Sequence, residues 1–141
     1  MKIERTVQSP RPPAEVFTYL SDFTTTTGWD PGTVRTTLVA GDGGVGTTYH
    51  NVSRFRGRRT ELTYTVTEYD PPLRVRLRGE NDTVIADDTM TLTATPTGGT
   101  AVTYRADFTL KGVAKVATPF LAGAFHRLGD EAEEGLRTAL A

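Results

Sequence analysis

The chain has 141 residues, a formal net charge of −1 and no cysteine. This length fits one hydrophobic core, and we expect a single domain over residues 1–141. The charge gives no global basic field that would attract nucleic acid or an anionic membrane. The absence of cysteine excludes disulfides, thiolate nucleophiles and cysteine-based metal sites.

The sequence shows no sign of a membrane protein. Its first residues, Met-Lys-Ile-Glu-Arg, lack the apolar segment of a signal peptide, and no apolar run approaches the roughly 18 residues that span a bilayer. We therefore expect a cytoplasmic protein that does not insert into membranes and does not bind nucleic acid. Both a monomer and a homodimer fit the sequence.

The chain begins with a strand and a helix. Weak alternation predicts a strand over Lys2–Ser9, and the prolines that follow end it. Apolar residues at helical spacing predict a helix over residues 12–22, with proline in its first turn. Residues 24–28 form either a second short helix or a tight loop.

The middle of the chain alternates between apolar and polar residues. Strands are predicted over residues 34–40, 47–55, 60–69, 73–79, 84–95 and 100–110, with short Gly-, Pro- and Asn/Asp-rich loops between them. Short connections predict hairpins and an antiparallel sheet. One face is apolar and aromatic, and the other carries threonines and arginines, so one face is predicted to be buried.

A long helix is predicted over residues 113–140, with a kink or a separate first turn at Pro119. Its apolar stripe at 100° per residue comprises Val113, Ala117, Phe120, Leu121, Ala124, Leu128, Ala132 and Gly135. The stripe must cover the apolar face of the sheet. Its small residues either allow close packing or leave space.

Several motifs resemble those of a known superfamily. They are Pro-Pro-Ala-Glu-Val-Phe-Thr-Tyr-Leu-Ser-Asp at 12–22, Trp-Asp-Pro at 29–31, Gly-Val-Gly-Thr at 44–47, Arg-Phe-Arg-Gly-Arg-Arg at 54–59 and Glu-Tyr-Asp-Pro-Pro at 68–72. Nearly the whole chain is similar to the START-like, or birch-pollen-allergen-like, superfamily (SRPBCC), and within it to the polyketide cyclase/dehydrase and lipid-transport group.

The resemblance implies an α+β helix-grip fold. In this fold a curved antiparallel sheet of about seven strands wraps around a long C-terminal helix, with one or two short helices after the first strand. It also implies a deep cavity between sheet and helix. It supplies no shared catalytic signature, and we expect no cofactor.

Three features of the sequence could suggest other chemistry, but their surroundings argue against it. Residues 41–46 match G-x-G-x-x-G, but a strand pattern follows where a dinucleotide site needs a helix, so a hairpin loop is favoured. His50 and His126 are both expected on the outside, and no metal site is predicted. Ser53 has no histidine predicted near it, which argues against a hydrolase.

The arginines at positions 54, 56, 58 and 59 form a basic hairpin tip. With Arg74, Arg76 and Arg78 they form either a basic patch or a solvated surface balanced by Glu61, Glu80 and Asp82. A nucleic-acid surface would need interleaved aromatic residues, so the solvated surface is favoured.

Two carboxylates are candidates for the interior. If Met90 and Leu92 face inward, Asp88 does too, and burial would raise its pKa toward that of a general acid or base. The alternative is that Asp88 reaches water at a strand end. Glu131 lies near the inner edge of the helix stripe, either lining the cavity or at its boundary.

The candidate ligand-binding residues face the expected cavity. They are Trp29, Tyr49, Asn51, Ser53, Leu62, Tyr64, Leu77, Asp88, Met90, Leu92, Tyr104, Phe108, Phe120, Ala124 and Leu128. The favoured function is binding or carriage of a small apolar, aromatic or polycyclic molecule.

Two other functions remain open. The resemblance implies, as one alternative, a cofactor-free polyketide cyclase/dehydrase, in which Asp88, Tyr64 or Tyr104 would move protons while Asn51 and Ser53 orient carbonyls. The other is a co-chaperone-like interaction module, which predicts an exposed apolar patch.

Overall fold

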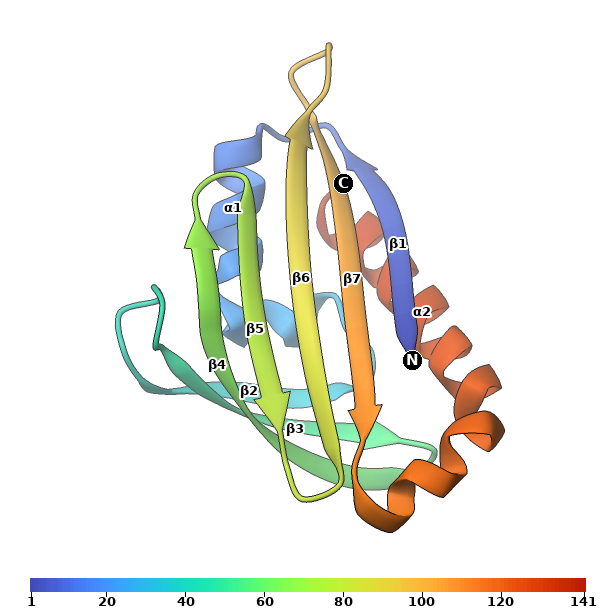
Figure 1. Cartoon of the computed structure of the whole chain (residues 1–141). Helices are drawn as coiled ribbons and strands as arrows, with labels where there is room; N and C mark the ends of the chain where they lie inside the picture. Colours follow the sequence, from blue (N-terminus) through green and yellow to red (C-terminus); the bar gives the residue numbers. More distant parts are fainter.

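The computed structural model describes residues 1–141 and contains one seven-stranded sheet with helices on its concave side (Figure 1). The elements are β1 (Lys2–Ser9), α1 (Pro13–Ser21), the 3₁₀ helix η1 (Phe23–Gly28), β2 (Thr33–Ala40), β3 (Thr48–Phe55), β4 (Arg58–Asp70), β5 (Arg74–Glu80), β6 (Val84–Ala94), β7 (Thr100–Leu110), the 3₁₀ helix η2 (Gly112–Ala117) and α2 (Thr118–Ala139).

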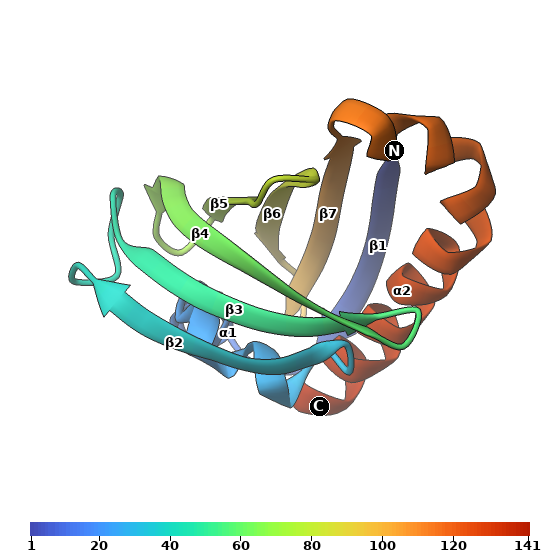
Figure 2. The same cartoon turned by 90° about the horizontal axis from the view of Figure 1, so that it is seen from below.

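The sheet confirms the predicted antiparallel arrangement. Its order is β1-β7-β6-β5-β4-β3-β2, and every neighbouring pair is antiparallel. The strands from β2 to β7 follow one another as hairpins, as their short connections predict. Seen from below, the sheet curves strongly, and α2 lies across its open side (Figure 2). The predicted helix-grip fold is therefore confirmed.

Alternation along the strands sets the two faces of the sheet. Residues Tyr64, Val66, Leu77 and Met90 are buried on the concave face, while the threonines and arginines between them are more exposed. At one end of this face, α1 packs against β6, and Phe17 of α1 meets Tyr69 edge-on at 5.4 Å. The core at this end is solid.

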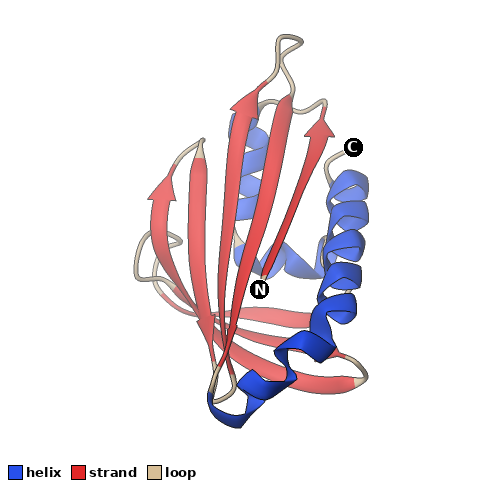
Figure 3. Cartoon of the chain, turned by 45° about the vertical axis from the view of Figure 1, so that its right-hand side comes forward, coloured by secondary structure: helices blue, strands red, loops and turns tan.

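The C-terminal helix differs from its prediction. Instead of one helix from residue 113, η2 ends at Ala117 and α2 begins at Thr118, with Pro119 in its first turn (Figure 3). Proline lacks an N–H group and fits only the start of a helix, so the expected separate first turn is observed. No helix of the structure is both long and apolar enough to cross a bilayer.

Because the two helical segments do not share one axis, the predicted apolar stripe is wrong at its beginning. Val113 and Phe120 are 93% and 82% exposed, whereas Phe125, which lies outside the predicted stripe, is buried. Further along, Ala132 and Leu136 are buried against the sheet. Only the residues after the break at Pro119 therefore determine which side of the helix is buried.

Both outcomes expected for the small residues of the helix occur. A side chain at Gly135 would overlap the carbonyl oxygen of Trp29, so this glycine allows close packing. Ala117 and Ala132, by contrast, line an open space.

Candidate ligand cavity

A cavity of about 420 Å³ lies between the concave face of the sheet and α2. Strands β3, β4, β6 and β7 form its wall, and residues around Trp29 close it between η1 and β2. Its mouth is bordered by the β3–β4 hairpin, the turn before β6, and η2. This volume falls in the range of small-molecule sites, about 300–1,000 Å³.

Most of the predicted binding residues line this cavity. These are Trp29, Asn51, Ser53, Leu62, Tyr64, Asp88, Tyr104, Phe108 and Leu128. The inward direction that alternation predicts for these strand residues is thus the observed one.

The other predicted binding residues lie elsewhere. Leu77, Met90 and Leu92 are buried in the closed core instead, because they share the concave face but sit beyond the end of the cavity. Tyr49 borders a separate groove beside α1.

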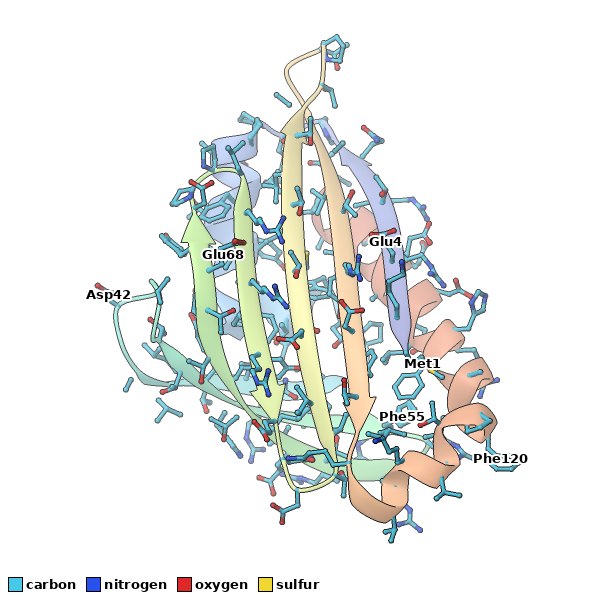
Figure 4. The ribbon with its side chains drawn as sticks, viewed as in Figure 1. Met1, Glu4, Asp42, Phe55, Glu68 and Phe120 are labelled. Carbon is cyan, nitrogen blue, oxygen red and sulfur yellow. The ribbon has the colours of Figure 1, made fainter.

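The two helix positions Phe120 and Ala124 do not line the cavity either. Figure 4 shows Phe120 pointing away from the body of the protein, whereas Phe55 lies toward the space between the sheet and α2. The sequence-based assignment of Phe120 is therefore wrong, for the reason given above: Pro119 starts a new helix. Glu131 is exposed and does not line the cavity.

Aromatic rings form much of the cavity wall. Phe125 of α2 lies 4.7 Å from Phe108 and 5.0 Å from Phe55, measured between ring centroids. On the opposite side Trp29 meets Tyr104 edge-on at 5.4 Å. The sequence analysis missed Phe55 and Phe125. Such a wall favours a flat, apolar ligand, because aromatic pairs prefer offset or edge-on contacts.

One polar cluster in the wall is already satisfied within the protein. Ser53 donates to the Asn51 side-chain oxygen at 2.7 Å, and the Asn51 amide donates to Thr36 at 2.8 Å. The Thr36 hydroxyl in turn contacts that of Thr26 at 2.6 Å. These groups need no ligand to complete their hydrogen bonds.

Asp88 is different, because its carboxyl group is buried without a cationic partner. The residue is 5% exposed, and its Oδ1 atom has no hydrogen-bond partner. Burial raises the pKa of Asp88 to about 8, helped by the negative charge of Asp30, while the Tyr64 hydroxyl acts in the opposite direction as a donor. At neutral pH this group is therefore mainly a neutral acid that can donate a hydrogen bond.

A second carboxyl group, that of Asp30, also lines the cavity and was missed in the sequence analysis. Asp30 accepts hydrogen bonds from the Gly32 N–H and the Thr33 hydroxyl, both at 3.0 Å. Burial raises the pKa of Asp30, and these two hydrogen bonds oppose the shift. The Asp-Pro-Gly sequence predicts the turn, but nothing in it shows that the turn closes a cavity.

Trp29 supplies a further unsatisfied group. The ring is 2% exposed, and its Nε1–H has no hydrogen-bond acceptor. A buried donor without an acceptor costs about 1–3 kcal/mol. Trp29 and Asp88 together leave two buried polar groups in the wall whose hydrogen bonds a ligand can complete.

The mouth of the cavity is basic. Arg54 and Arg58 are exposed residues of the cavity lining. Of the arginines expected to be balanced by Glu61, Glu80 and Asp82, Arg78 pairs with Glu80, whereas neither Arg54 and Arg58 nor Arg56 and Arg59 make an ion pair. Glu61 pairs with His50, and Glu80 pairs with Lys111 and Arg78.

The histidines are not placed for metal binding. His50 lies 3.0 Å from Glu61, and His126 lies 3.5 Å from Asp130, on different elements. No group of three His, Asp or Glu side chains is arranged to hold a metal ion.

The full length of the chain, residues 1–141, matches the family model described as "Polyketide cyclase / dehydrase and lipid transport". The chain belongs to this family. No functionally curated protein matches it by sequence.

Solved structures share the family fold with low sequence identity. TTHA0849 from Thermus thermophilus is 17% identical with a TM-score of 0.82, covering 99% of this chain and 97% of its own. The Zhui aromatase/cyclase from Streptomyces sp. R1128 is 14% identical with a TM-score of 0.82, covering 98% and 92%. A START superfamily protein from Mycobacterium smegmatis is 12% identical, again with a TM-score of 0.82, covering 99% and 96%. At these identities the similarity establishes the fold alone.

Proposed function

We propose that this family member binds a small, apolar, ring-containing molecule that carries a carbonyl or similar hydrogen-bond acceptor. The observation that carries the proposal is the aromatic cavity with two buried, unsatisfied polar groups, Asp88 and Trp29. At neutral pH both present a hydrogen to the ligand, because the raised pKa keeps Asp88 mostly protonated. Carriage of such a molecule is the role that follows.

The proposal is tested with a matched pair of tricyclic probes. 9-Fluorenone carries a carbonyl group, and fluorene has the same ring system without it. Trp29 is the only tryptophan and lies in the cavity wall, so quenching of its fluorescence reports fluorenone entry directly. Native mass spectrometry measures both probes. We expect saturable binding of fluorenone and binding of fluorene weaker by about tenfold, which corresponds to one hydrogen bond.

A cavity-filling variant provides the control. Ala132 is buried and lines the cavity, while Ala122 lies exposed on the same helix. Ala132→Leu should weaken fluorenone binding at least tenfold, and Ala122→Leu should leave it unchanged. If the Ala132→Leu variant does not fold, the Ala117→Phe variant, which fills the mouth of the cavity, is tested in its place. Unsaturable quenching, or equal binding by the filled variant, would refute the proposal.

A second candidate function is acid–base catalysis, which the environment of Asp88 specifically favours. A general acid works best with a pKa near the working pH, and Asp88 meets that condition. Its neighbour Tyr64 is also buried, and its pKa is raised well above its usual value by burial and by Asp88. A ketone bound here would take the Asp88 proton at its oxygen while a water molecule removes an α-hydrogen, which gives the enol, and the Asp88 carboxylate would then regain a proton from the hydronium ion formed.

This candidate is tested by proton exchange rather than by an unknown overall reaction. The exchange of the α-hydrogens of 2-tetralone for deuterium is followed by NMR with and without protein. We expect acceleration by the wild-type chain, loss of it in Asp88→Asn, and retention in Asp87→Asn. No acceleration by the wild-type protein would leave binding alone as the function.

A further inference from the structure

Three exposed apolar side chains gather beside the mouth of the cavity. Val113 and Val116 of η2 and Phe120 at the start of α2 are 93%, 75% and 82% exposed, the highest values among the large apolar residues of the chain. We call these three residues the apolar rim. Isolated exposed apolar residues are ordinary, but a cluster at the entrance of a cavity marks an interaction surface.

The apolar rim arises from the geometry of a 3₁₀ helix. With three residues per turn, Val113 and Val116 share one side of η2, and Ala114 and Ala117 share another. The two alanines line the cavity, while the two valines face solvent. This short helix is therefore apolar on both sides, and nothing within the chain covers its outer side.

Positive charge surrounds the same mouth. Arg54 and Arg58 line it, Arg56 and Arg59 complete the hairpin tip, and Lys115 lies between the rim valines on η2. None of these five residues makes an ion pair. Of the nearby acidic residues, Asp82 has no ion-pair partner, Glu61 contacts only His50, and Glu80 is paired with Lys111 at 2.8 Å. The mouth is therefore strongly positive although the whole chain has a net charge of −1.

We propose that this mouth docks on the surface of an anionic lipid membrane, with the apolar rim entering the headgroup region and the arginines binding lipid phosphates. Surface docking of this kind needs no membrane-spanning helix, and it combines buried apolar side chains with basic attraction. In this orientation the cavity opens toward the membrane, so an apolar ligand can enter without crossing water. The net charge of the chain alone argues against binding to an anionic surface, but the positive charge gathered at the mouth favours such binding.

The geometry favours a membrane over a protein partner. The rim side chains stand on a short 3₁₀ helix and on the first turn of α2, and three-quarters or more of each is exposed, so they do not form the packed patch typical of protein interfaces. A fluid headgroup layer accommodates such projecting side chains without a complementary pocket.

Vesicle co-sedimentation tests the proposal with the full chain. The vesicles consist of phosphatidylcholine alone or with about 30% phosphatidylglycerol, at low and high salt. We expect binding only to the anionic vesicles, decreasing as salt rises. Phe120→Ser with Val116→Ser should weaken it by about tenfold or more. Arg56→Gln with Arg59→Gln should weaken it by about fivefold per arginine.

Matched controls lie on other surfaces of the protein. Leu38→Ser with Val39→Ser removes exposed apolar residues of β2, and Arg76→Gln with Arg78→Gln removes arginines of the solvated face. Both should leave vesicle binding unchanged.

Three results would overturn the proposal: no vesicle binding, equal binding to neutral vesicles, or rim variants that bind as the wild type does. If the wild-type chain self-associates but does not bind vesicles, and the rim variants lose this self-association, the rim is instead the contact surface for a second copy of the chain. Without vesicles, fluorenone should still quench Trp29 fluorescence in all rim variants. A failure of membrane docking can therefore be distinguished from a failure of the proposed ligand binding.

Discussion

Replacing Asp88 with asparagine should change how stability depends on pH. In the native chain burial raises the pKa of Asp88 to about 8, whereas in the unfolded chain the group returns to its ordinary value of 3.8. Between these values the folded state keeps a proton that the unfolded state releases. The unfolded chain thus binds fewer protons, and the free energy of unfolding falls as pH rises from about 4 to about 8.

The size of this effect follows from the shift. Each pKa unit corresponds to about 1.4 kcal/mol, so the whole shift amounts to at most about 6 kcal/mol. Between pH 5 and pH 8 the wild-type chain should lose about 4 kcal/mol through Asp88 alone. That is a large part of the roughly 5–15 kcal/mol that holds a typical domain folded. An asparagine side chain cannot ionise, and so the Asp88→Asn variant lacks this loss.

Urea unfolding at pH 5, 6, 7, 8 and 9 measures the difference directly. We expect Asp88→Asn to match the wild type near pH 5, to gain stability relative to it with each pH unit, and to reach a constant advantage above pH 8. Asp87→Asn is the control, because Asp87 lies on the same strand, is less buried and lies 3.8 Å from Arg76. Parallel stability curves for Asp88→Asn and wild type between pH 5 and 8 would show that Asp88 is ionised throughout and would refute the reasoning.

Two further predictions concern glycines. Gly135→Ala should destabilise the chain by several kcal/mol, because its Cβ would overlap the Trp29 carbonyl oxygen. Gly123→Ala, on the open side of α2, should instead stabilise the chain by about 0.5–1 kcal/mol. Urea unfolding measures both changes. Similar urea midpoints for the two variants would contradict the close packing of Gly135 against Trp29. Gly79→Ala should weaken fluorenone binding, because its Cβ would lie 2.6 Å from the Tyr64 ring and push that ring into the cavity; unchanged affinity would argue against this.

The concave face of the sheet was predictable because a strand has a period of two. Once Met90 and Leu92 are placed inside, Asp88 must follow, and it is indeed buried. Alternation does not, however, say where along a strand the cavity begins. Met90 and Leu92 therefore share the face of Asp88 but belong to the solid core near α1.

The parts of the site outside regular elements were not predictable from periodicity. The sequence places Trp29 among the candidate cavity residues but within no regular element, and for Asp30 it predicts only a turn. The turn itself is correct, with Gly32 and Thr33 donating to the carboxylate. Its place over the cavity depends on the close approach of Gly135 of α2 to the Trp29 backbone, a contact between residues more than a hundred positions apart.

The break at Pro119 explains both the main error of the sequence analysis and the most unusual surface of the protein. A continuous α-helix from residue 113 would turn about 100° at each residue and would leave the apolar side chains on a single stripe. The 3₁₀ segment turns about 120° instead, so its residues three apart align, and its valines and alanines separate onto two different sides. The alanines then line the cavity while the valines stand outside it, at a mouth that Arg54 and Arg58 also line. A helix without this break would have placed Val113 and Phe120 on the buried stripe and removed them from the apolar rim.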